Sequence, residues 1–139
     1  MKLDILILII TTLSVHASEC PNLDGKFKCP VGPYSNGKVF SLKSHSDGYT
    51  FTSNGFTERW KFTGIRMDAG EGHFESEFCE NSSWVLIIEY PNGKIDRVER
   101  FITNGQMTHR ISSFHAIDYI TSTIQTPEVQ ELLCESIEE

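Results

Sequence analysis

Apolar and polar side chains alternate along most of the chain, with short interruptions that contain glycine. A period of two residues is typical of strands that bury one face, and dipeptides such as Asn54-Gly55 and Asn104-Gly105 favour the tight turns of hairpins. The predicted strands span residues 25–31, 38–46, 49–53, 57–66, 72–80, 84–90, 95–103 and 106–115. We therefore predict an all-β fold, an eight-stranded antiparallel up-and-down meander that closes into a barrel and leaves no free edge.

The pattern changes after the last predicted strand. Thr126 and Pro127 are typical of the start of a helix, and apolar residues then recur at helical spacing. The sequence therefore predicts a C-terminal α-helix over residues 127–137, packed on the outside of the barrel. An open antiparallel sheet covered by this helix, an α+β fold, is the alternative. The apolar residues of the predicted helix are Val129, Leu132, Leu133 and Ile137.

The first residues have the features of an export signal. Lys2 precedes an apolar stretch over residues 5–13, and Val15-His16-Ala17 supplies a cleavage pattern. This apolar stretch is too short to span a bilayer. We predict a signal peptide over residues 1–17, a single barrel domain with its helix over residues 18–139, and a secreted or periplasmic protein that is not inserted in a membrane.

Four cysteines in an exported chain predict two disulfides, for which three pairings are possible. Cys20 and Cys29 are symmetric about Asp24-Gly25, so a two-residue hairpin there would place them opposite each other. This favours Cys20 with Cys29, which leaves Cys79 to join Cys134 and fix the helix to the barrel. No Cys-x-x-Cys spacing indicates redox or zinc chemistry.

The predicted turns also give a register for the strands. If Asn92-Gly93 closes a two-residue loop, Trp84 lies opposite Phe101 and Leu86 lies opposite Glu99. The interior would then be aromatic with charged groups set into it, and Phe74 and Phe78 would point inward. The aliphatic exterior would consist of Val85, Ile87, Val98, Ile102 and Ile111.

A binding site in this interior would combine apolar walls with a few polar anchors. For the three charged residues of this set, the alternative is a solvent-facing group of ion pairs on an open sheet. The predicted wall consists of Trp60, Phe62, Trp84, Leu86 and Phe101, and the predicted anchors are Arg97, Glu99 and Arg110.

The predicted arrangement resembles the lipocalin and wider calycin group. Gly25-Lys26-Phe27 stands where the first strand of that family carries a Gly-x-Trp motif, with Phe27 in place of the tryptophan. Arg110 lies on the strand where the family has an arginine over that tryptophan. The resemblance implies a cup that binds small, mostly apolar molecules.

Composition and motifs narrow the function further. The net charge is −7 and no basic run is present, which argues against nucleic acid as a partner. No Gly-x-Ser-x-Gly turn and no zinc-ligand spacing are present, so we expect no enzymatic activity, no metal and no cofactor. The predicted function is that of a monomer that binds a small apolar or amphipathic molecule. The alternative is a secreted protein-interaction or inhibitor module that uses loops at 67–72 and 80–83, with a packed barrel and no ligand.

Overall fold

The structure is a computed structural model that describes residues 20–115 and 127–138. One curled antiparallel sheet accounts for most of these residues, and the predicted signal peptide lies outside them. The order of its strands is β4-β3-β2-β1-β10-β9-β8-β7-β6-β5. The strands are β1 (Gly25–Lys28), β2 (Val39–His45), β3 (Gly48–Ser53), β4 (Phe56–Lys61), β5 (Met67–Gly70), β6 (His73–Glu80), β7 (Ser83–Glu89), β8 (Lys94–Thr103), β9 (Gln106–His115) and β10 (Glu128–Ser136).

A strand is present at each of the eight predicted positions, although β4 ends at Lys61 instead of residue 66 and β1 ends at Lys28 instead of residue 31. The structure adds β5 and β10. The prediction of a C-terminal helix is wrong, because Glu128–Ser136 is a strand. Leu132 and Cys134 are buried whereas Val129 and Leu133 are exposed, so the burial has a period of two. Strand β10 pairs with β9 on one side and β1 on the other, and these partners outweigh the local helical pattern. Within residues 20–115 and 127–138 there is no helix, and thus none long and apolar enough to cross a membrane.

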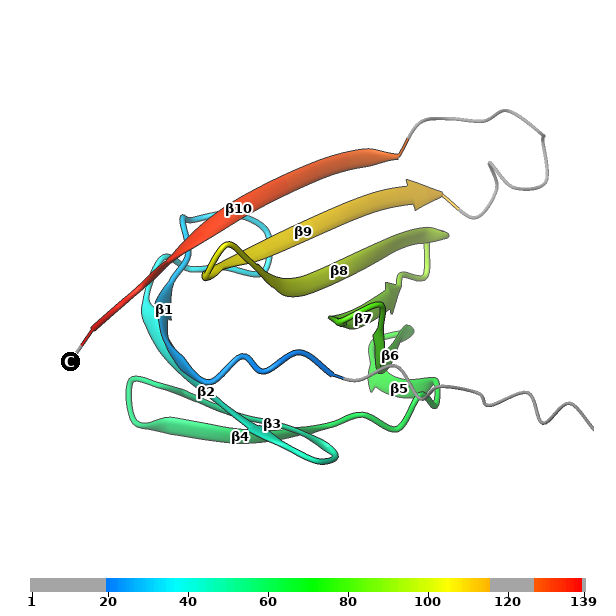
Figure 1. The fold of residues 1–139 in the computed structure, drawn as a ribbon. Coiled ribbons are helices and arrows are strands. Elements are labelled where there is room, and N and C mark those ends of the chain that lie inside the picture. The colour runs from blue at the N-terminus through cyan, green and yellow to red at the C-terminus, as the bar shows by residue number, and fades with distance from the viewer. Residues whose placement is uncertain (1–19, 116–126, 139) are drawn as a thin grey trace, which may run out of the picture.

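The sheet does not close into a barrel. It curls so that β2–β4 lie opposite β8–β10, and the pairing of β1 with β10 joins the two ends of the chain (Figure 1). No ladder joins β4 to β5. Instead, the Gly64 backbone N–H donates to the carbonyl of Glu77, 2.9 Å away, so the chain after β4 runs along β6. The predicted closure of the barrel is therefore wrong, because β4 and β5 do not pair.

The disulfides join Cys20 to Cys79 and Cys29 to Cys134, so the favoured pairing of Cys20 with Cys29 is wrong. The physical reason is that β1 pairs with β10 and β2, and not with the segment before it. The pairing of Lys28 with Glu135 continues by one residue to Cys29 and Cys134, whose Cα atoms are 4.0 Å apart. Two disulfides indicate an oxidising environment of the extracellular type.

The predicted register of β7 with β8 is also wrong, by one residue. Trp84 lies opposite Arg100 instead of Phe101, because the connecting loop has three residues, Pro91-Asn92-Gly93. The Gly93 N–H donates to the Tyr90 carbonyl at 3.0 Å, and Gly93 has a φ of 83°, which is the geometry of a turn followed by a bulge. By contrast, the predicted register across Asn104-Gly105 is confirmed.

This one-residue shift decides which side chains point inward. Cys79, Trp84, Arg100, His109 and Leu132 form one row across β6–β10 on the inner face. Phe74 and Phe78 lie on the outer face, contrary to the prediction. So do Val85 and Ile87, whereas the other predicted exterior residues, Val98, Ile102 and Ile111, share the inner face with Trp84. The buried core comprises Leu23, Phe27, Cys29, Leu42, Tyr49, Trp84, Met107 and Cys134.

Candidate functional site

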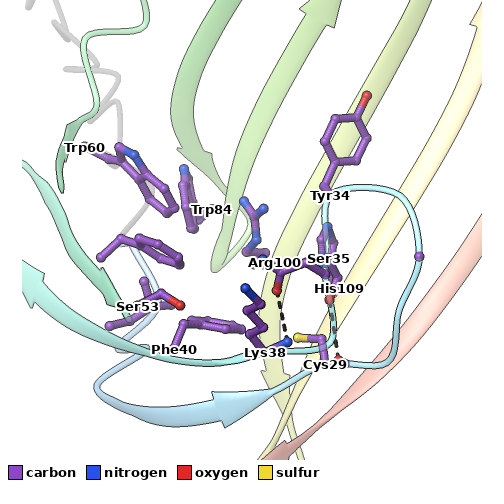
Figure 2. A pocket seen from close by; sticks show the side chains of 14 residues that line it. Cys29, Tyr34, Ser35, Lys38, Phe40, Ser53, Trp60, Trp84, Arg100 and His109 are labelled. Atoms are coloured by element: carbon purple, nitrogen blue, oxygen red, sulfur yellow. Dashed lines mark hydrogen bonds between the residues drawn. The ribbon is translucent and has the colours of Figure 1, made fainter. Parts of the chain in front are cut away.

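A cavity of about 560 Å³ lies between the two halves of the curled sheet and is partly open to solvent. Strands β2–β4 contribute Phe40, Phe51 and Trp60 to one wall, and the row Trp84, Arg100 and His109 forms the opposite wall. The loop between β1 and β2 completes the lining, with Tyr34, Ser35 and Lys38 among its residues (Figure 2).

The aromatic side chains of the cavity form a continuous column. Phe40 stacks on Phe51 with ring centroids 5.5 Å apart, and Phe51 stacks on Trp60 at 4.8 Å. Trp60 contacts Trp84 at 4.9 Å. The column arises because the alternation of β2, β3 and β4 directs these rings to the same face, opposite Trp84 of β7. It gives the cavity a flat, polarisable wall.

Arg100 stands at the end of this column. Its guanidinium carbon lies 4.3 Å from the centre of the Trp84 ring, a cation–π contact. Burial lowers the pKa of Arg100 to about 10, a change that the nearby Glu77 opposes, so the guanidinium remains charged at neutral pH. Within the described residues, it forms no hydrogen bond or ion pair.

His109 lies beside Arg100 in the row and is 2% exposed. Burial, together with the positive charge of Arg100, lowers the pKa of His109 to about 3, so its imidazole is neutral at physiological pH. Its Nε2 atom and the Nε1 atom of Trp84 are buried without a hydrogen-bond partner among the described residues. This end of the cavity therefore holds one fixed positive charge and an uncharged ring.

Glu77 is the acidic group that affects the pKa of Arg100, and it lies on the inner face, outside the cavity lining. Burial raises the pKa of Glu77, although the Trp84 indole nitrogen and Arg100 partly oppose that change. The indole N–H lies near the carboxyl but outside hydrogen-bonding geometry, and Glu77 Oε2 is itself without a partner among the described residues. Glu77 is thus a poor counter-ion for Arg100.

The loop that lines the cavity is held at two points. The disulfide of Cys29 fixes its start to β10, and the Tyr34 hydroxyl donates a hydrogen bond to the carboxylate of Asp96 on β8. Asp96 is 2% exposed. It accepts a further hydrogen bond from Ser113 at 2.7 Å and forms an ion pair with Lys94 at 3.0 Å. Burial would raise the pKa of Asp96, but these donors outweigh it and lower the pKa. The wall of the cavity is therefore anchored to the sheet.

The structure brings together only part of the predicted binding set. Trp60 and Trp84 line the cavity, and Phe62 packs beside them, with its ring centroid 6.2 Å from that of Trp84. Leu86 shares the inner face but lies outside the lining.

The predicted anchors lie on the opposite face of the sheet. Arg97 pairs with Glu80 at 2.6 Å and with Glu99 at 3.1 Å, and Arg110 pairs with Glu131 at 2.6 Å. Phe101 lies beside them under the guanidinium of Arg110, 4.8 Å away. This is the arrangement of solvent-facing ion pairs that the sequence left open as the alternative.

The predicted binding set did not include Arg100, His109 and Lys38, which supply polar groups to the cavity, or the aromatic residues Phe40 and Phe51. A signal for Arg100 was present in the sequence. Proline at the first central position of a turn, with glycine two residues later, favours the three-residue loop that Pro91-Asn92-Gly93 adopts. That loop length would have placed Arg100 opposite Trp84.

Among the residues that the structure describes, no group of three or more His, Cys, Asp or Glu side chains could hold a metal ion. Comparison with protein-family models, with curated proteins and with solved structures gave no match. No family is therefore identified for the chain.

Proposed function

We propose that the protein binds a small molecule with an apolar body in the cavity between β2–β4 and β7–β9. The observation that supports this proposal is a cavity of about 560 Å³ with a column of aromatic side chains, Phe40, Phe51, Trp60 and Trp84, in its wall. Cavities of roughly 300 to 1,000 Å³ with mostly apolar walls are typical of small-molecule sites. This volume supports a ligand-binding protein over the loop-based interaction module with a packed interior.

The exposure of the wall supports the same proposal. Phe40, Phe51 and Trp60 lie on the inner face, yet each is only half-buried. A ligand with an apolar body would remove the remaining surface of these rings from water, which is favourable by about 25 cal/mol per Å². The disulfide and the Tyr34 contact keep the cavity formed in the absence of ligand, and this reduces the ordering cost of binding.

The test is a titration with N-phenyl-1-naphthylamine, a neutral probe that fluoresces in apolar surroundings. We expect saturable binding, with energy transfer from tryptophan, because both tryptophans of the chain line the cavity. Trp60→Leu should weaken binding about tenfold, measured by direct excitation of the probe, because a stacking surface is lost.

Phe101→Leu is the matched control, since Phe101 is also a half-buried aromatic but lies on the outer face. It should leave the affinity unchanged. If the folded protein shows no saturable enhancement, the proposal is wrong. Equal losses of probe affinity in the two variants would show that the probe binds elsewhere, and this would contradict the proposal as well.

A further inference from the structure

The charges that line the cavity are unlike those of the chain as a whole. The chain carries 19 acidic and 12 basic residues, but the residues that line the cavity include Arg100 and Lys38 and no aspartate or glutamate. Figure 2 shows both side chains directed into the space beside the aromatic column. The cavity is therefore a local positive site in an acidic protein.

Arg100 also differs from every other arginine of the chain. Arg59, Arg66, Arg97 and Arg110 each form an ion pair with an aspartate or glutamate. Arg100 forms none within the described residues, although it alone of the five lines the cavity. It is half-buried there, and a half-buried guanidinium without an acceptor is unfavourable.

The orientation of Arg100 suits a ligand acceptor. One face of the guanidinium is occupied by the Trp84 ring, which leaves its N–H groups free to donate in the plane. A planar fork of donors matches the two oxygens of a carboxylate. His109 beside it is neutral, so it carries no negative charge that would compete with a ligand for the guanidinium. Glu77 lies outside the lining.

Together with the cavity proposed above as the binding site, these observations identify the class of ligand. We propose that the molecule bound in the cavity is an amphipathic anion, whose carboxylate is bound by Arg100 with support from Lys38 and whose apolar body lies along Phe40, Phe51 and Trp60. This inference rests on the proposed function and adds the charge of the ligand to it.

The test is a displacement series with three ligands that have the same chain and different heads. N-phenyl-1-naphthylamine is bound first and then displaced by dodecanoate, dodecanol or dodecylamine below their micelle concentrations, above neutral pH where the carboxylate is ionised. We expect dodecanoate to bind at least about tenfold more tightly than dodecanol, which is the effect of a charge-assisted hydrogen bond. Dodecylamine should bind most weakly, and added salt should reduce the preference for dodecanoate.

Two arginine variants locate the charge that is responsible. Arg100→Met keeps a side chain of similar length over Trp84 and should lower the affinity for dodecanoate to that of the same variant for dodecanol. Arg110→Met is the matched control, because Arg110 also lies over an aromatic ring, Phe101, but on the outer face. It should change none of the three affinities.

The outcomes separate the two proposals. Saturable probe binding with equal displacement by dodecanoate and dodecanol overturns the anionic ligand and leaves the binding function in place. Loss of the dodecanoate preference in Arg110→Met but not in Arg100→Met would also overturn it. Absence of binding by the probe and by all three ligands overturns both proposals. If Arg100→Met does not fold, the comparison of the three ligands in the unchanged protein still decides the charge.

Discussion

Arg100 and His109 are neighbours in one row of the sheet, but only the arginine is charged at neutral pH. His109 is buried and Arg100 is half-buried, and two adjacent positive charges in that position would repel each other. Arginine holds its proton far more strongly than histidine does, so the histidine is the group that becomes neutral. The electrostatic character of the cavity is thus decided by one pair of residues.

This pair predicts a specific dependence of stability on pH. The pKa of His109 is about 3 in the folded protein and 6.5 in the unfolded chain. Below pH 6.5 the unfolded state binds a proton that the folded state does not, so stability falls as the pH falls, by up to about 1.4 kcal/mol per pH unit. His109→Gln removes this contribution.

We therefore expect the free energy of unfolding of the unchanged protein to decrease by about 2 kcal/mol more than that of His109→Gln between about pH 7 and about pH 5. Urea unfolding of both proteins at the two pH values measures the difference. Glu77, whose pKa is raised by burial, acts in the opposite sense but is common to both proteins. Parallel pH dependences would show that His109 is protonated in the folded state.

The hairpin of β3 and β4 presents Trp60 to the cavity, and its geometry depends on a single glycine. Gly48 lies opposite Lys61 at the start of β3, with a φ of 156°. A Cβ atom there would lie 1.7 Å from the backbone oxygen of Trp60, which cannot move without separating the strands. Gly55, in the turn of the same hairpin, has a φ of 78° and open space around it.

Alanine at these two glycines should therefore have different effects. Gly55→Ala should cost about 1 to 2 kcal/mol, because only the positive φ is unfavourable. Gly48→Ala should cost about 3 kcal/mol or more and should weaken probe binding, because β4 and Trp60 are displaced. Thermal unfolding and probe titration measure both effects. Similar costs for the two variants would contradict the close approach at Gly48.

At the level of elements, much of the sheet could be predicted, because short turns make neighbours in sequence pair in space. The turn at Asn104-Gly105 gave the correct register of β8 with β9, since a two-residue loop allows only one. The register of β7 with β8 failed because Pro91 lengthens the loop, and one residue moves Arg97, Glu99 and Phe101 from the inner face to the outer. Arg100 was missed for this reason.

The pairing of strands that lie far apart in the sequence could not be predicted from local patterns. The apolar residues of the last segment have helical spacing, and the pairing of this segment with β1 and β9 outweighs that local pattern. Pairing of β1 with β10 also determines the disulfides, because it brings Cys29 opposite Cys134, far away in sequence. Each of these errors has the same origin, the contact between the two ends of the chain.

The whole molecule depends on that contact, and the contact is small. Phe27 pairs with Ser136 and Lys28 with Glu135 between β1 and β10, and the Ile137 N–H donates to the Lys26 carbonyl at 2.9 Å. The disulfide of Cys29 with Cys134 is next to these pairs. The other disulfide joins Cys20, in the segment before β1, to β6. The loops that the two disulfides close have sequence separations of 105 and 59 residues.

These separations predict similar stabilisation from loop closure, about 4 to 5 kcal/mol for each disulfide. If variants that lack one or the other disulfide differ in probe binding, the difference therefore reflects a change in the sheet and not a difference in stability. Replacing Cys29 and Cys134 by alanine should open the β1–β10 pairing, release the loop that lines the cavity and abolish probe binding. Replacing Cys20 and Cys79 should lower stability by a similar amount but preserve probe binding. Peptide mapping without reduction, urea unfolding and probe titration test this. Retained binding in the first variant, or equal loss in both, would show that the cavity does not depend on the pairing of β1 with β10.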